Sequence, residues 1–240
     1  MPQYFIELYA EKYFLNEFVY HFPSNDDAYV VIRDGEYFLT GPLFEKCTSF
    51  DEFLPLARMA MDEMHATLWA MRAITLRPQI GNPFRIEDDG TIVGGLNPGE
   101  GGGHVMPDVR VLPEDTTTIP TPTRAQSLRQ KLAADRHLTF AITLVTLNNA
   151  QWSHLYRCLE EIEAFLRQKV SAARLCSEAE RERFTRTANT AESAGLDSRH
   201  RSGKFDPPVN PMSFREARDF MTKLCRNAIA YREDSKHQGG

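Results

Sequence analysis

The residues best suited to chemistry lie between residues 181 and 204, where six lysines and arginines accompany three acidic residues. Arginine binds phosphate through paired hydrogen bonds, and a histidine with a pKa near neutrality can transfer a proton. Together they could cleave an RNA backbone, with histidine moving the proton and arginine stabilising charge on the phosphate. The candidate catalytic residues are Arg186, Arg199 and His200, and the candidate binding residues are Arg181, Arg183, Asn189, Arg201 and Lys204.

Two other interpretations of this segment stay open. The same side chains could bind RNA without cleaving it, because phosphate contacts need no catalytic group. They could also be structural, since arginine and histidine beside a glycine-containing loop often bond the last carbonyls of a helix. A long polar loop in a small domain needs such ties to stay ordered.

The sequence contains no pattern typical of metal or cofactor chemistry. Cysteines at zinc-ligand spacing, a paired-histidine motif and a serine-nucleophile motif are all absent, so we expect no metal and no cofactor. The cysteines have the surroundings of small buried hydrophobic residues. We therefore expect four reduced thiols in a cytoplasmic protein: Cys47, Cys158, Cys176 and Cys225.

Charge is divided unevenly along the chain. Residues 1–123 carry 8 basic and 19 acidic residues, whereas residues 124–240 carry 20 basic and 14 acidic residues. This division indicates two units with different partners or two units that attract each other, and only the second has the charge that RNA binding requires. No apolar run approaches the ~18 residues needed to cross a membrane, and no secretory signal opens the chain, so we expect no membrane contact.

The first 112 residues predict an acidic α+β domain. Residues 1–40 are strand-like, and strand pairs are predicted around Asp34-Gly35 and Asp89-Gly90, because Asp-Gly suits tight type I′ turns. A helix is predicted over residues 49–73. Ser49 and Glu52 have the form of a capping box there, and Pro55 indicates where the regular helix begins.

The second half of the chain predicts helices. Residues 113–123 contain three prolines and five threonines and predict a linker. Amphipathic helices are expected within 124–147, within 150–170, over 177–189 and from residue 213, before a flexible tail at 233–240. The expected fold is α+β: N-terminal antiparallel β-hairpins with one helix in residues 1–112, then a C-terminal four-helix bundle in residues 124–232.

The C-terminal half also carries recognisable segments, which read WSHLYRCLEEIE, RFTRTAN, SRH and PPVNPMSFREA. On these segments the chain resembles a group of uncharacterised bacterial proteins with an Arg-His pair and a following Asn-Pro-Met. Their helical region is similar in plan to HEPN domains, which are helical bundles found in toxins and antiphage systems. The resemblance spans roughly residues 125–232 and implies a helical bundle and dimerisation.

The same resemblance bears on catalysis. HEPN ribonucleases carry an arginine and a histidine several residues apart on one helix, whereas Arg199 and His200 are adjacent here. Arg226 and Asn227 resemble the common opening of that motif, but Tyr231 and Arg232 stand where a histidine is needed. The resemblance therefore implies the bundle without implying RNA cleavage.

These observations predict a non-enzymatic interaction or accessory module of a bacterial cytoplasmic system, whose partner is another protein or a second copy of the chain. The alternative is an HEPN-like RNA-binding protein or metal-independent ribonuclease with a role in defence or toxicity. A third class is a small-ligand sensor built on the N-terminal sheet, whose melting temperature would rise when its ligand binds.

Overall fold

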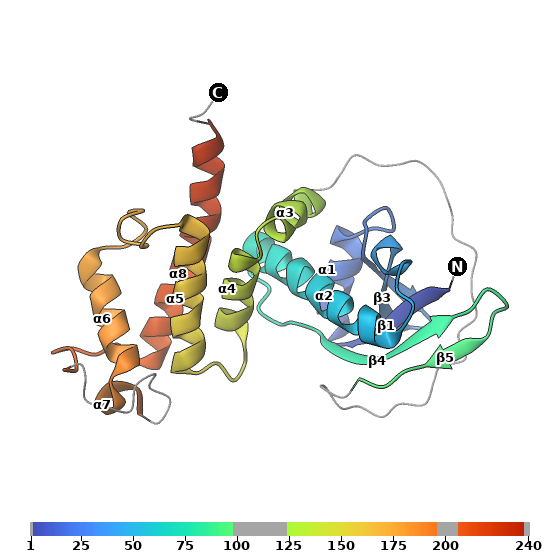
Figure 1. Ribbon diagram of the computed structural model, residues 1–240, viewed down its shortest axis with the longest axis horizontal. Coiled ribbons are helices and arrows are strands. Elements are labelled where there is room, and N and C mark those ends of the chain that lie inside the picture. Colours follow the sequence, from blue (N-terminus) through green and yellow to red (C-terminus); the bar gives the residue numbers. More distant parts are fainter. Residues whose placement is uncertain (1, 98–123, 196–205, 238–240) are drawn as a thin grey trace. The chain divides into compact units, whose positions relative to one another are not determined.

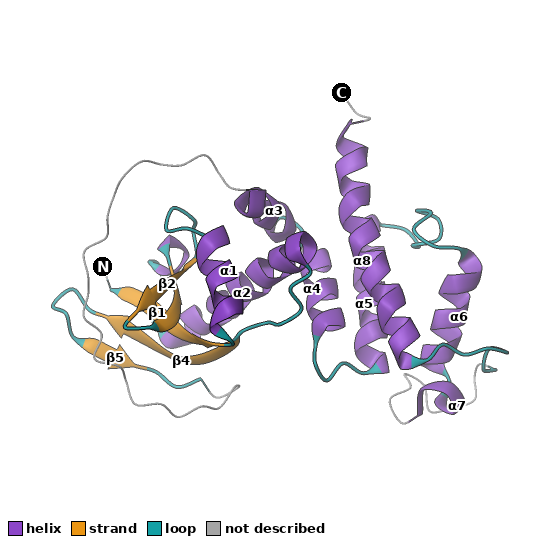
Figure 2. Cartoon of the chain, turned by 180° about the vertical axis from the view of Figure 1, so that it is seen from behind, coloured by secondary structure: helices purple, strands orange, loops and turns teal. Residues whose placement is uncertain are grey.

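The computed structural model describes residues 2–97, 124–195 and 206–237, without the side chains of Ala191 and of residues 232–237. The chain combines helices with an antiparallel sheet, and it divides into two compact units, Met1–Lys131 and Leu132–Gly240 (Figures 1 and 2). The mixed α+β class predicted from the sequence is confirmed.

The first unit is built on a five-stranded sheet with the order β2-β3-β1-β4-β5. Neighbouring strands pair antiparallel throughout. Asp34 and Gly35 both have positive φ and connect two strands so that Arg33 faces Glu36. Type I′ turns need that conformation at both central residues, which explains why Asp-Gly predicted this turn. The strands are β1 (Gln3–Tyr9), β2 (Tyr29–Arg33), β3 (Glu36–Thr40), β4 (Gln79–Ile86) and β5 (Ile92–Gly94).

One face of this sheet forms the main core with helices α1 (Lys12–His21) and α2 (Phe50–Arg72). Alternate side chains of β1 point to opposite faces, so Tyr4, Ile6 and Leu8 pack against the helices. Phe5 points to the other face, where it forms a smaller cluster with Phe38, Phe84 and Ile86. A short 3₁₀ helix, η1 (Pro42–Phe44), follows β3.

Two predictions for the first unit are wrong in detail. Residues 1–40 are not all strand, because α1 lies between β1 and β2 and buries Leu15 and Phe18. Helix α2 begins at Phe50, where Ser49 Oγ accepts the Glu52 N–H at 3.3 Å, and not at Pro55. Pro55 therefore lies in the second turn of the helix, where it has no N–H to donate to the Asp51 carbonyl.

The second unit is helical, and three of its helices meet at an aromatic cluster. Contacts link α4 with α5, α4 with α8, α5 with α8, and α5 with α6. Trp152 packs against Phe184 and Phe214, and Phe184 also packs against Phe220. The helices are α4 (Arg136–Thr146), α5 (Trp152–Leu166), α6 (Glu178–Asn189), α7 (Ala191–Ala194) and α8 (Phe214–His237).

The single helix expected within 124–147 is also wrong. The segment forms α3 (Arg124–Ala133) and α4, because the Asp135 carboxylate accepts the His137 N–H at 3.2 Å and starts a new helix. The division between units follows Lys131, so most of α3 folds with the first unit, although the composition placed the boundary at 113–123. That expected linker lies outside the described residues. Helix α8 continues to His237, past the start of the expected tail.

Candidate functional site

Helix α6 carries the described members of the predicted RNA site. Its start is a capping box, as predicted: Ser177 Oγ accepts the Glu180 N–H at 3.1 Å, and the Glu180 carboxylate accepts the Ser177 N–H at 2.9 Å. The cap fixes where the helix begins. It therefore sets which faces Arg181 and Arg183 occupy, only one and three residues further along.

Arg181 binds Glu163 of α5 through both arms of its guanidinium. Its Nε and Nη2 donate to the two carboxylate oxygens at 2.7 and 3.2 Å. These hydrogen bonds raise the pKa of Arg181 above its usual value. Glu163 also accepts the Val170 N–H at 3.2 Å, so this ion pair ties α6 to both α5 and the segment after it.

Arg183 makes a similar paired contact with Glu216 of α8. Its Nη1 and Nη2 donate to the carboxylate at 2.6 and 3.0 Å, and its Nε donates to the Asn210 carbonyl at 2.7 Å. The hydrogen bond from Arg183 lowers the pKa of Glu216. The guanidinium therefore joins α6 to the first turn of α8.

The other predicted residues do not join these two arginines in one site. Arg186 is exposed on α6, and Asn189 is half-buried at the helix end. Arg199, His200, Arg201 and Lys204 lie outside the described residues. Within the described part of the chain, the arrangement of Arg181 and Arg183 fits the structural interpretation of this segment.

Replacing Arg181 by alanine lowers the free energy of unfolding by about 1–2 kcal/mol, because a half-buried charged hydrogen-bond pair is lost. Arg186→Ala on the same helix is the matched control, and its exposed position predicts a change within about 0.5 kcal/mol. Urea denaturation of both variants measures the difference. Equal effects of the two substitutions would contradict a structural role for Arg181.

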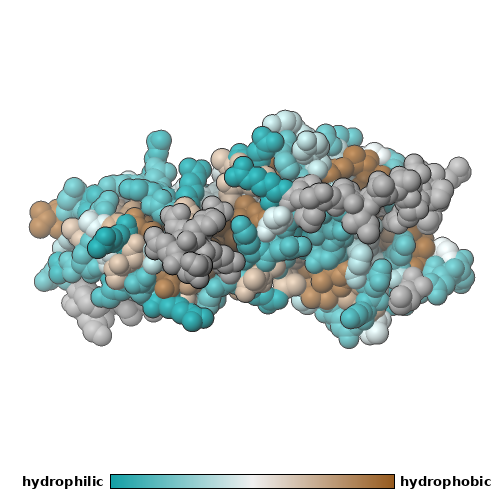
Figure 3. All heavy atoms as spheres, turned by 90° about the horizontal axis from the view of Figure 1, so that it is seen from above, coloured by the Kyte–Doolittle hydropathy of each residue, from teal (hydrophilic) through white to brown (hydrophobic). Residues whose placement is uncertain are grey.

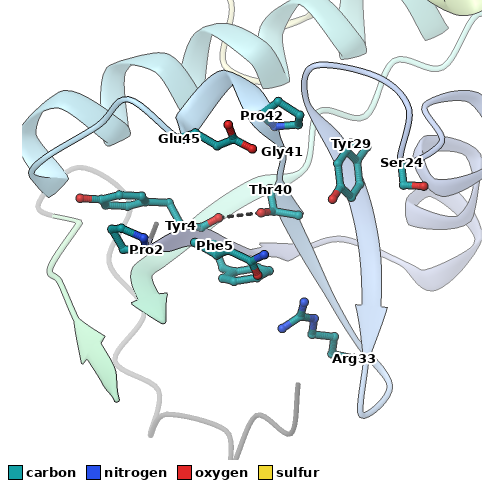
Figure 4. A pocket seen from close by; sticks show the side chains of 11 residues that line it. Pro2, Tyr4, Phe5, Ser24, Tyr29, Arg33, Thr40, Gly41, Pro42 and Glu45 are labelled. Carbon is teal, nitrogen blue, oxygen red and sulfur yellow. Dashed lines mark hydrogen bonds between the residues drawn. The ribbon is translucent and has the colours of Figure 1, made fainter. Parts of the chain in front are cut away.

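A pocket that sequence reasoning missed lies in the first unit. It has a volume of about 140 Å³ and lies among the start of β1, both ends of β2 and the end of β3 (Figure 4). The Arg33 guanidinium carbon lies 4.3 Å from the centre of the Phe5 ring, at the pocket wall. The Thr40 hydroxyl donates to the Tyr4 carbonyl at 2.7 Å. Pairing of distant strands brings these residues together, so no local sequence pattern marks them.

The pocket wall is held in place by close backbone packing. Gly41 has a φ of 141°, and a Cβ atom there would lie 2.5 Å from the Asp27 carbonyl oxygen. The same oxygen accepts the Leu43 N–H at 2.8 Å. Only glycine permits this approach, so Gly41 joins the end of β3 to the segment before β2.

Arg129 of α3 supports the same wall from the interior. Its guanidinium lies 3.0 Å from the Asp26 carboxylate, 2.7 Å from Asp27 and 3.5 Å from Glu63, and it donates to the Ala28 carbonyl at 3.1 Å. Burial raises the pKa of Asp26, and the charge of Arg129 opposes that shift. These contacts explain why α3 folds with the first unit.

Among the described residues, no three His, Cys, Asp or Glu side chains lie close enough together to hold a metal ion. All four cysteines are free thiols, and the Sγ atoms of Cys158 and Cys225 lie 3.8 Å apart in the second unit. None of the described helices combines the length and apolar character that crossing a bilayer requires.

No family model, no curated protein and no solved structure matches this chain.

Proposed function

We propose that this chain is a non-enzymatic interaction module that pairs with a second copy of itself through helix α1. The observation that carries the proposal is the pair of exposed tyrosines on that helix: Tyr13 is 70% exposed and Tyr20 is 75% exposed. Residues seven apart lie on the same face of an α-helix. Tyrosine is enriched at protein interfaces, because its ring is apolar and its hydroxyl can still bond.

Other large apolar side chains of the described residues are also exposed, among them Leu96 at 82% and Val209 at 107%. Figure 3 shows a mainly hydrophilic face on which hydrophobic residues form separate patches. Separate exposed apolar residues are normal for a protein surface and need no partner. Tyr13 and Tyr20 differ from such single residues because both are exposed on one face of the same helix.

The pattern on α1 is self-complementary under a two-fold axis. An antiparallel pair of α1 helices would place Tyr13 of each copy against Tyr20 of the other, with Asn16 opposite Glu17. Asn16 accepts the Tyr37 hydroxyl through its Oδ1 at 2.6 Å, so its amide group can donate to the opposite carboxylate. The same residues would then serve both halves of the interface.

The proposal includes a four-helix bundle of α4, α5, α6 and α8 as the second unit. The contacts among these helices support it, as does the aromatic cluster that α5, α6 and α8 share. An HEPN-like plan for this unit, a protein partner in place of a second copy and a bacterial cytoplasmic setting remain predictions from the sequence.

The structural role of Arg181 and Arg183 weighs against the RNA alternative, because both guanidinium groups already bind carboxylates. The test is incubation of the purified chain with labelled RNA, for the wild type and for the double variant Arg199→Ala/His200→Ala. We expect no cleavage by either protein. Cleavage by the wild type that the double variant loses would overturn a non-enzymatic function.

Replacing both tyrosines, Tyr13→Ser/Tyr20→Ser, weakens self-association at least tenfold, because each exposed ring contributes about 1 kcal/mol or more at an interface. Tyr231→Ser is the matched control, since it removes the same ring from α8. Analytical ultracentrifugation over a concentration series gives the dissociation constants. An unchanged constant for the double variant would exclude α1 as the interface.

A further inference from the structure

We infer that Cys158 and Cys225 form a disulfide bond when the chain folds in the presence of a disulfide oxidant, and that this bond then joins helices α5 and α8. Their Sγ atoms lie 3.8 Å apart, although the two residues are 67 positions apart in the sequence. Cys47 lies in the first unit, and Cys176 lies between α5 and α6. The fold therefore brings these two of the four free thiols into contact.

The two sulfurs lie near the distance that a bond requires. A disulfide bond is about 2.05 Å long, so the Sγ atoms need to approach by about 1.8 Å. Shared equally, that is about 0.9 Å for each sulfur, a displacement no larger than the thermal motion of an ordered atom. Cys158 also donates to the Ala141 carbonyl of α4 at 3.3 Å, so its sulfur is held where α4, α5 and α8 meet.

The chemistry is two successive thiol–disulfide exchanges with a small disulfide such as glutathione disulfide. The thiolate of one cysteine attacks the oxidant, so a mixed disulfide forms and one glutathione leaves. The thiolate of the other cysteine then attacks the cysteine sulfur of that mixed disulfide, which forms the Cys158–Cys225 bond and releases the second glutathione. The two cysteine thiols lose two electrons and two protons in total, and the oxidant gains both as two glutathione thiols.

Folding decides when this exchange can take place. Cys158 and Cys225 are both 0% exposed, so no oxidant touches them while the bundle is closed. The hydrogen bond with Cys225, together with burial, also raises the pKa of Cys158, which leaves little of the thiolate that exchange needs. The pair therefore reacts while α5 and α8 are still apart, and the closed bundle then preserves whichever redox state was present when it formed.

The test is refolding of the full, reduced chain from urea into a buffer that contains glutathione disulfide and glutathione. Free thiols are then blocked with N-ethylmaleimide, and linked peptides are identified by mass spectrometry. We expect the peptides of Cys158 and Cys225 to be joined in at least half of the chains. Two unlinked thiols, or a bond from either residue to Cys47 or Cys176, would overturn the inference.

The closed bundle supplies a second arm of the same experiment. Folded, reduced protein kept in the same buffer for the same time should contain at least tenfold less of the linked pair. Equal linking of the folded and the refolding chains would overturn the conclusion that folding sets the redox state. Cys176→Ala, at a half-buried cysteine outside the pair, is the matched control and keeps the link, whereas Cys225→Ala loses it.

The consequence of the bond is measured by amide hydrogen exchange of the linked and the reduced protein. A bond between α5 and α8 restrains their separation, so we expect the buried amides of α8 to exchange at least tenfold more slowly in the linked protein. The strands of the first unit are the internal reference and keep their rates. Equal rates in α8 would overturn the joining of the two helices. This result is independent of self-association through α1, which the ultracentrifuge measures separately.

Discussion

Replacing Arg129 by alanine lowers the free energy of unfolding of the first unit by about 3–5 kcal/mol, because the substitution leaves buried carboxylates without their counter-charge. The Arg129 residue is only 4% exposed, and Glu63 and Asp26 beside it are also largely buried. The same substitution removes the hydrogen bond to the Ala28 carbonyl next to β2. The charge cluster that Arg129 forms with Asp26, Asp27 and Glu63 therefore loses its cation. The pocket wall beside β2 loses the hydrogen bond that holds it to α3.

The measurement uses urea denaturation with a reporter in the first unit. Trp69 is buried in α2 and Trp152 lies in α5, so a Trp152→Phe background leaves Trp69 as the single fluorescent tryptophan. Arg124→Ala is the matched control, because it removes an exposed arginine from the same helix. A loss below about 1 kcal/mol for Arg129→Ala would show that this cluster does not hold the unit together.

Acidification destabilises the first unit through His65. This side chain is fully buried in α2, and burial, together with the charge of Arg77, lowers its pKa to about 4. An unfolded histidine binds its proton near pH 6.5, so the unfolded state takes up protons first as the pH falls. The contribution of His65 to the free energy of unfolding is therefore fully present above pH 6.5. It is lost as the pH falls from 6.5 towards 4. Between pH 7 and pH 5 the loss is about 2 kcal/mol.

The difference in stability between wild type and His65→Gln isolates this effect from the titration of carboxylates. The glutamine variant is less stable at pH 7, because it places a different polar group in the same buried position. Its deficit shrinks by about 2 kcal/mol between pH 7 and pH 5, since glutamine does not titrate. His137→Gln removes an exposed histidine of α4 and is the control. A deficit that stays constant over this pH range would show that His65 is not the titrating group.

Much of the fold follows from local signals in the sequence. Ser49 with Glu52 and Ser177 with Glu180 mark helix starts that the structure confirms, and the Asp34-Gly35 turn has the φ values that predicted it. Helix α1 could not be predicted in this way. Its tyrosines, phenylalanines and valine also favour strands, and burial of Leu15 and Phe18 against the sheet decides between the two.

The candidate sites were harder to predict than the elements. Arg181 and Arg183 have the residue types of a phosphate site, but their carboxylate partners Glu163 and Glu216 come from other helices. The pocket differs from the arginine site because no sequence pattern marks its residues. Phe5, Arg33 and Thr40 come together only when the sheet forms, with β1 beside β3 and β2 on the other side of β3. Pairing of segments far apart in the chain decides both outcomes.

Sedimentation equilibrium of the wild-type protein tests most directly whether this chain binds a second copy of itself. We expect a mass that rises with concentration from that of one 27.4 kDa chain to that of two. We also expect that Tyr13→Ser/Tyr20→Ser needs at least tenfold higher concentrations to reach the same mass. A wild-type mass of one chain at every concentration would contradict self-association.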